Sequence, residues 1–282
     1  MAIEAVGKID FGDIDDDIYS GMMRLLKRYF TNGMDNTQYR GGLLNTGTVQ
    51  TEWEISAIKN YVLGTKMIKP DGREFIYAKA GATGLGKALM HQSSVSIANY
   101  YEQVQTAYGW AIGATSGTVL ITTGATPTAN LWTDGWMCCN KGVGLGQLYK
   151  IATNTAHATI PTVTLYDPIV IAIAAASEIS IIANRFAGTI VCPVTTLTAR
   201  PVGVPLVAVT ALYYYWSQVK GPAPMTVDTG DTIVIGEPVG SAGTNAVAGA
   251  VGVGTTTEGH YGRALTIGTA DETAIIDLDL GL

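Results

Sequence analysis

The stretch Val-Gly-Val-Pro-Leu-Val-Ala-Val at residues 202–209, together with the chain that follows it, decides the fold. After it come further short runs rich in Val, Ile, Thr and Tyr: Tyr-Tyr-Tyr-Trp-Ser-Gln-Val-Lys-Gly-Pro-Ala-Pro (213–224), Thr-Ile-Val-Ile-Gly-Glu-Pro-Val (232–239), Gly-Arg-Ala-Leu-Thr-Ile (262–267) and Ala-Ile-Ile-Asp-Leu-Asp-Leu (274–280). Runs of this kind, separated by Gly and Pro, are typical of β-strands. The segment holds almost no residue suited to chemistry, which indicates a part of an assembly and not an enzyme.

The middle of the chain has the same character. Its clearest predicted strands are 74–80, 118–123, 162–167, 168–173 and 178–183. No helical run of ten or more residues alternates with them, so a parallel α/β fold is not expected. The sequence predicts a mainly β protein, built from antiparallel β-barrel or sandwich units.

The N-terminal region differs from the rest. Residues 1–12 are expected to form an extended arm, and 18–30 a short helix that follows the acidic residues 13–17. Its apolar side chains recur at helical spacing, at Ile18, Met22, Leu25, Leu26 and Tyr29. Arg24, Lys27 and Arg28 would lie on its solvated face.

Three regions are expected along the chain. Residues 1–70 form the N-terminal arm and helical region, 71–200 a β-domain, and 201–282 a C-terminal β-unit. The second boundary is placed by the prolines in and around 194–205. The Gly/Ala-rich segment 240–254 is low in complexity, but its spaced valines argue against a plain flexible linker.

Composition limits the partners. Charged residues are only 14% of the chain, against about 25% in a usual globular domain. So few charges would leave apolar patches uncovered on a monomer, so we expect obligate association. A net charge of −6 argues against nucleic acid as a partner.

The sequence also points to a cytoplasmic protein. The N-terminus lacks the pattern of a signal peptide, and the longest apolar stretch, 169–176, is too short to cross a bilayer. We therefore expect assembly in a cytoplasm and no membrane partner. Three cysteines, two of them adjacent, are expected to be packed, reduced thiols.

Several motifs imitate functional sites. Gly-Ala-Thr-Gly-Leu-Gly-Lys (81–87) has the spacing of a phosphate-binding loop, but Ala88 stands where that loop needs Ser or Thr. Gly-Val-Gly-Leu-Gly (142–146) fails the dinucleotide fingerprint, because its third glycine comes one residue too early. Both are interpreted as glycine-rich turns.

Metal and nucleophile patterns are equally weak. His91, His157 and His260 are isolated, and residues 13–17 lack the Gly and Glu of a calcium loop. Cys138 and Cys139 would point to opposite faces of a strand. We expect no catalytic residue, no metal site and no cofactor.

The aromatic run Tyr-Tyr-Tyr-Trp (213–216) has two interpretations. Aromatic side chains on an exposed strand face could stack on sugars or bases. Packing across a β-core is the commoner use and is the favoured one here.

The segment Ala-Leu-Tyr-Tyr-Tyr-Trp-Ser-Gln-Val-Lys-Gly-Pro-Ala-Pro (211–224) resembles the C-terminal region of capsid decoration, or cement, proteins of tailed bacteriophages. In that group the aromatic strand follows a Val-Gly-Val strand, here 202–205. It precedes a Val-x-Gly-x-Pro-Val strand, here 234–239, and a Gly-x-Ala-Leu strand, here 262–265. The resemblance extends over roughly 75–282 and leaves out residues 1–70.

This resemblance implies a structural virion protein that binds the outer face of an HK97-type shell and reinforces the seams between capsomers. It implies the major capsid protein as partner, a homotrimer, and a place on the capsid exterior. We expect the five apolar residues of the predicted helix (18–30) to contact the capsid. A head-fibre or tail component in low copy, and a carbohydrate-binding β-module using Tyr213, Tyr215 or Trp216, are the alternatives.

Overall fold

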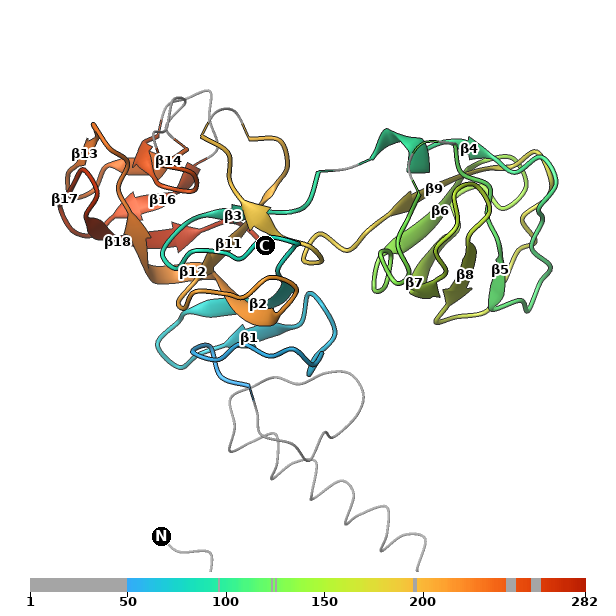
Figure 1. The fold of residues 1–282 in the computed structure, drawn as a ribbon, viewed down its shortest axis with the longest axis horizontal. Coiled ribbons are helices and arrows are strands. Elements are labelled where there is room, and N and C mark those ends of the chain that lie inside the picture. The colour runs from blue at the N-terminus through green and yellow to red at the C-terminus, as the bar shows by residue number, and fades with distance from the viewer. Residues whose placement is uncertain are drawn as a thin grey trace, which may run out of the picture.

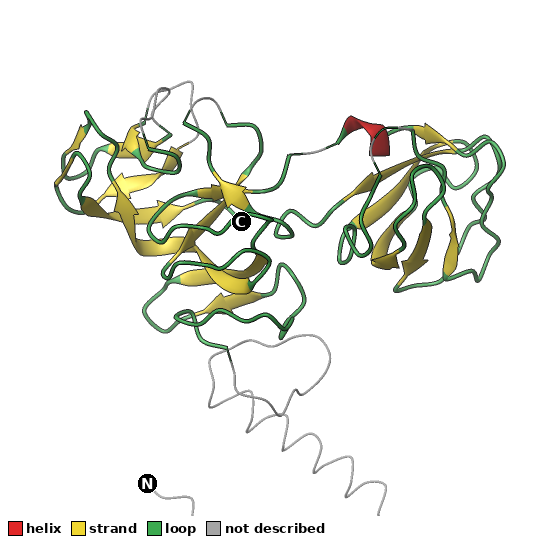
Figure 2. Ribbon diagram, in the orientation of Figure 1, coloured by secondary structure: helices red, strands yellow, loops and turns green. Residues whose placement is uncertain are grey.

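A computed structural model describes residues 50–95, 97–122, 124, 126–194, 197–241, 247–254 and 260–282. Within these ranges the chain is almost entirely strand and loop, and the helical element is one 3₁₀ turn, η2 (Ala98–Tyr100) (Figure 2). The predicted mainly β fold with antiparallel sheets is thereby confirmed. The expected N-terminal arm and helix lie outside the described residues.

The larger sheet has ten strands, in the order β10-β3-β11-β12-β18-β16-β14-β15, with β2 also pairing with β12 and β1 with β2. All of these pairings are antiparallel. We call this part of the chain the base unit. Its strands are β1 (Lys66–Ile68), β2 (Glu74–Lys79), β3 (His91–Gln92), β10 (Ile190–Val191), β11 (Pro201–Pro205), β12 (Tyr214–Thr226), β14 (Pro238–Gly240), β15 (Gly252–Val253), β16 (His260–Ala264) and β18 (Thr273–Asp279). A small two-stranded sheet, β13 (Thr232–Ile233) with β17 (Gly268–Thr269), accompanies it.

The second sheet has six strands, in the order β4-β9-β6-β7-β8-β5, and forms what we call the inserted unit. Its strands are β4 (Gln103–Val104), β5 (Ser116–Thr118), β6 (Trp136–Lys141), β7 (Leu148–Asn154), β8 (Thr162–Leu165) and β9 (Glu178–Ile182). All six come between β3 and β10 of the base sheet. Two chain segments connect the units, and the inserted unit stands beside the base (Figure 1).

The predicted boundary at residue 200 does not coincide with an edge of either sheet. Strands β2 and β3 lie before it, and they pair with β12 and β11, which lie after it. The prolines that suggested the boundary stand at the two ends of β11, Pro201 and Pro205. A strand tolerates proline at such positions because the missing N–H costs the ladder little there.

The long strand β12 organises the base unit. It pairs with β2 and β11 along its first half and with β18 along its second. Its first half is buried on both faces, whereas in its second half buried and more exposed residues alternate. The run of buried residues at 215–219 therefore marks a part of the strand that is covered on both sides.

In strand β18 buried and solvent-exposed side chains alternate, as expected for a strand with one face in the core and one in solvent. Ala274, Ile276 and Leu278 are buried, while Asp277 and Asp279 between and beyond them face solvent. The strand predicted for 274–280 is confirmed, and its period of two places every second side chain in the core.

Three strand predictions were wrong in detail. Of the predicted strand 118–123, the structure places only Thr118 in a strand, at the end of β5, and 119–122 in a loop. Residues 168–173 form a loop, in which Ile169 and Ile173 are buried and Ile171 is exposed. The run 232–239 is split into β13 and the start of β14 by a turn at Gly236, whose φ of +85° breaks an extended strand.

Each unit has its own core. The inserted unit buries Trp110, Trp132, Met137 and Ile151 among others. The base unit has two adjoining clusters, one around Tyr77 and Trp216 and one around Met225 and Tyr261. These cores account for the rigid framework on which the surfaces described below are displayed.

Candidate functional site

The five predicted capsid-contact residues, Ile18, Met22, Leu25, Leu26 and Tyr29, lie outside the described residues. Their role stays a prediction. The described part of the chain offers its own candidates, which are a buried polar junction and an exposed apolar surface.

The glycine motif at 81–87 is part of the base-unit framework. Leu85 exchanges backbone hydrogen bonds with Val209, 2.8 and 2.9 Å long, and no helix follows the motif. The Gly86 carbonyl accepts a hydrogen bond from Nε2 of His91 at 3.2 Å. A phosphate-binding loop requires its backbone N–H groups to open a helix, so this segment does not have that geometry.

His91 is fully buried and belongs to the core. Its Nδ1 lies 3.3 Å from the Tyr215 hydroxyl, which is 2.9 Å from Oγ1 of Thr189. Burial lowers the pKa of His91 to about 3, because the low-dielectric interior disfavours the imidazolium. The ring is therefore neutral and structural at ordinary pH.

The remaining histidines do not gather ligands. The Nδ1 atom of His157 accepts hydrogen bonds from the backbone N–H groups of Thr159 and Ile160. His260 lines a shallow groove with Arg263 and Asp277. Among the described residues no group of three or more His, Cys, Asp or Glu side chains is arranged to hold a metal ion. The same residues contain no helix long and apolar enough to cross a membrane.

The aromatic run is mostly interior. Tyr215 and Trp216 are buried, and Nε1 of Trp216 donates to the Gln50 carbonyl at 2.8 Å. Tyr77 lies between Tyr214 and Trp216, with ring centroids 5.8 and 5.0 Å away. The packing interpretation of these side chains is thus confirmed, and neither Tyr215 nor Trp216 presents a face to a sugar.

Two of the three thiols are unsuited to nucleophilic attack. Cys139 and Cys192 are buried and Cys138 is half-buried, and all three are free. Burial raises the pKa of Cys139, and it raises the pKa of Cys192 to about 12. Because the thiolate is the reactive form, these two groups are inert at neutral pH.

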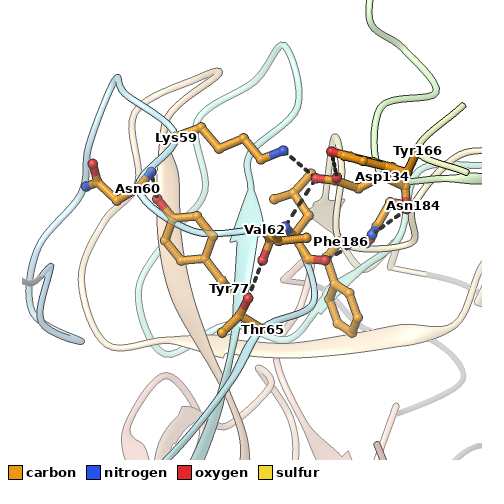
Figure 3. A network of polar contacts seen from close by, with 10 residues as sticks. Lys59, Asn60, Val62, Thr65, Tyr77, Asp134, Tyr166, Asn184 and Phe186 are labelled. Carbon is orange, nitrogen blue, oxygen red and sulfur yellow. Dashed lines mark hydrogen bonds and ion pairs between the residues drawn. The ribbon is translucent and has the colours of Figure 1, made fainter. Parts of the chain in front are cut away.

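A buried carboxylate joins the two units (Figure 3). Asp134 of the inserted unit forms an ion pair with Lys59 of the base unit, and its side chain has no exposed surface. It accepts further hydrogen bonds from the Leu63 N–H at 3.3 Å and from the Tyr166 hydroxyl at 2.9 Å. We call this set of contacts the junction.

Asn184 completes the junction from the second connecting segment. Its Nδ2 donates to the carbonyls of Leu63 and Asp134, both at 3.1 Å, and its Oδ1 accepts from the Phe186 N–H (Figure 3). The Nδ2 group of Asn184 therefore bridges the two units, while its Oδ1 makes a local contact within the connecting segment. Partial burial of the Tyr166 phenol, whose side chain is still half exposed, and its hydrogen bond to Asp134 raise the pKa of Tyr166 to about 12, since both favour the protonated phenol.

The backbone at Asp134 is itself specialised. Its φ is +61°, a left-handed conformation that Asp and Asn tolerate better than most residues. Gly135 follows, where an added Cβ would lie 2.3 Å from the Ile182 carbonyl oxygen. This close approach places β6 directly beside β9 and fixes the carboxylate at the start of the sheet.

The opposite end of the inserted unit carries the exposed apolar surface. β6 leads away from the junction to Lys141, and β9 returns toward it from Glu178. Three loops meet beyond those residues, and their exposed aliphatic side chains form what we call the distal apolar surface: Ile112, Val143, Leu145, Val170 and Ile171.

Hydrogen bonds join the three loops. Gly113 N–H donates to the Ile169 carbonyl at 2.7 Å, and Trp110 and Ile173 exchange two backbone hydrogen bonds. The Val143 carbonyl accepts from Oγ of Ser177 at 2.8 Å. The motif at 142–146, rejected as a nucleotide fingerprint, is thus the loop that displays Val143 and Leu145.

Sequence reasoning missed both features. The junction draws Lys59, Asp134 and Tyr166 from distant points of the chain, and no spacing connects them. The distal apolar surface had a signal, since both 142–146 and 169–176 are apolar and uncharged. The sequence does not tell which of those side chains face solvent.

The chain was compared with protein-family models, with curated proteins and with solved structures, and none of the three comparisons gave a match.

Proposed function

We propose that this chain is a structural virion protein of a tailed bacteriophage that binds the outer face of the capsid and reinforces the seams between capsomers. Its partners are the major capsid protein and further copies of itself, as a homotrimer. It has no enzymatic role, and it takes its place on the capsid exterior after synthesis in the host cytoplasm.

One observation carries the proposal. The segments of the phage-decoration resemblance, 202–205, 211–224, 234–239 and 262–265, include most of β11, β12, β14 and β16. With β18 they are consecutive strands of one sheet, in the order β11-β12-β18-β16-β14. Motifs scattered over 60 residues of sequence therefore belong to one structural module, as a shared architecture requires.

The surface chemistry also supports an assembly role. The chain carries few charges and exposes a cluster of aliphatic side chains at the end of the inserted unit. Exposed apolar patches of this kind are characteristic of interaction sites. Copies that each contact several capsomers would bind through many weak contacts at once, which raises the effective affinity.

The first test is the copy number of the chain relative to the major capsid protein in purified particles, by quantitative mass spectrometry. We expect a fixed large fraction of the capsid copy number. A handful of copies would place the chain in a head fibre or tail instead, and complete absence from particles would remove the virion role.

A second test concerns residues 1–30. Deletion of this segment should leave a folded β-body that no longer sediments with capsids. As matched variants, replacing the five apolar residues 18, 22, 25, 26 and 29 by Ser should abolish binding, whereas replacing Arg24, Lys27 and Arg28 by Gln should not. Undiminished binding by the deletion would refute the assignment of capsid contact to this segment.

The carbohydrate-binding alternative has lost two of its three candidate side chains, because Tyr215 and Trp216 are buried. Tyr213 is half-buried. Absence of binding on a glycan array would exclude the alternative.

A further inference from the structure

The distal apolar surface differs from scattered exposed side chains. Its five members are between 46% and 70% exposed, and they lie on three loops that hydrogen-bond to one another. No charged residue occurs in 107–117, 142–149 or 168–177, the segments that contain these loops. A contiguous patch of this kind is of the order of a few hundred Å², the size at which exposed apolar area marks an interaction site.

The loop at 142–146 is built to hold its side chains outward. Its three glycines have φ of +85°, +92° and +83°, a region that disfavours any side chain. An added Cβ would lie 2.8 Å from Oγ of Ser177 at Gly142 and 3.2 Å from Cγ1 of Ile173 at Gly144. Gly142 and Gly144 therefore face the body of the unit, and Val143 and Leu145 are presented in a fixed conformation.

We propose that further copies of this chain cover the distal apolar surface, with the same surface of each copy meeting around the three-fold axis of the trimer. This proposal names the residues through which copies of the chain associate. It rests only on the self-association stated in the proposed function. It does not depend on the capsid.

The charge distribution of the chain favours another copy of itself as the partner at this surface. The chain carries a net charge of −6, so most faces of two copies repel each other weakly at neutral pH. The distal apolar surface contributes no charge, and Lys141, which directly precedes the loop at 142–146, is paired with Glu178 at 2.7 Å. Two copies can thus meet here without like-charge repulsion.

The same charge pattern disfavours a lipid surface. Segments that bind anionic membranes combine apolar side chains with unpaired Lys and Arg, and these loops contain none. The size is also suitable for a protein partner. A stable interface buries about 800 Å² per partner around an apolar core, and this patch would supply that core.

The test is sedimentation velocity of the full-length purified chain over a concentration series, without capsids. The distal variant carries Ile112→Asn and Leu145→Asn, which replace side chains that are 70% and 65% exposed. The matched control carries Ile235→Asn and Ile267→Asn in the base unit, at 67% and 62% exposure. Circular dichroism and thermal melting establish that all three proteins are folded.

We expect the wild type and the control to associate with similar affinity, and the distal variant to dissociate at least about tenfold more readily. On dilution of the wild type, amide exchange should rise at 143–146 and 170–172. A wild type that stays monomeric at high concentration would overturn the proposal, as would equal association of the distal variant. Loss of association in the control variant alone would move the contact to the base unit, and binding of the wild type to neutral lipid vesicles without self-association would make lipid the occupant.

Discussion

Replacing the junction carboxylate should loosen the contact between the two units while leaving each unit folded. Asp134→Asn is the appropriate change, because Asn keeps the size of the side chain and tolerates its φ of +61°. The substitution removes the negative charge that faces Lys59, the Leu63 N–H and the Tyr166 hydroxyl.

The size of the effect follows from those three contacts. A hydrogen bond to a charged group contributes about 1.5–3 kcal/mol, and one to a neutral group about 1 kcal/mol. The charge of Asp134 therefore adds about 1 kcal/mol at each contact. The Lys59 side chain is 29% exposed, so water would recover part of its loss. We expect Asp134→Asn to weaken the junction by about 2 kcal/mol, and Asp134→Ala by about 4 kcal/mol, since Ala also leaves a buried N–H unpaired.

Calorimetry and hydrogen exchange measure this. The wild type should unfold in one transition, and Asp134→Asn in two partly separated transitions, because each unit keeps its own core. Amide exchange at Leu63 should accelerate by about thirtyfold, which corresponds to 2 kcal/mol. Proteolysis of the connecting segment around residues 183–188 should quicken in parallel.

Glu178→Gln is the matched control. It also removes one negative charge from the inserted unit, but its partner Lys141 is 71% exposed. Such a pair contributes less than about 1 kcal/mol. If Asp134→Asn and Glu178→Gln gave the same melting profile and the same exchange at Leu63, the junction would not be what holds the units together.

Further predictions concern the base unit and the thiols. The pKa of His91 is about 3 in the folded protein and about 6.5 in the unfolded one, so the unfolded state binds more protons between these values. The free energy of unfolding should then fall by about 1 kcal/mol per pH unit as the pH drops below 6.5. His91→Gln should flatten this slope in urea titrations from pH 7 to 4. An unchanged slope would refute the assignment of this pH dependence to His91. Gly262→Ala should destabilise the base unit by more than about 2 kcal/mol, because its Cβ would lie 2.0 Å from the Asp277 carbonyl oxygen. Gly86→Ala, whose Cβ would meet only the flexible Leu89 side chain, is the control for a melting experiment. A thiol reagent at pH 8 should modify Cys138 alone in the native protein and all three cysteines in urea; rapid modification of three native thiols would contradict the burial of the other two.

The strand content could be predicted from the sequence because it is a local property. Alternation at 274–280 and the β-branched runs at 162–165 and 178–182 each indicate a strand without knowledge of its partner. The loop at 168–173 was misjudged for the same reason. An Ile-rich run is compatible with a buried strand, and only the packing of Ile169 and Ile173 on Trp110 and its neighbours makes it a loop.

The insertion and the junction depend on pairings that no local pattern contains. β3 pairs with both β10 and β11, which follow it by about a hundred residues. The prolines near residue 200 suggested a boundary because proline usually ends a strand, yet here it occupies strand ends within one sheet. Asp134 gave no sequence signal, because its importance comes from the burial of its side chain against Lys59.

The insertion also orders events on the ribosome. Gln92 of β3 lies opposite Ile190 of β10, so the chain leaves the base sheet and returns to it at neighbouring points. Everything that the inserted unit needs has been synthesised by Ile182, whereas β2 and β3 must wait for β12 and β11. Domains fold as units as they emerge during synthesis. The inserted unit can therefore fold while β2 and β3 of the base unit still lack their partner strands. Once folded, it keeps the two points where the chain leaves and re-enters the base sheet close together until β11 and β12 have been synthesised.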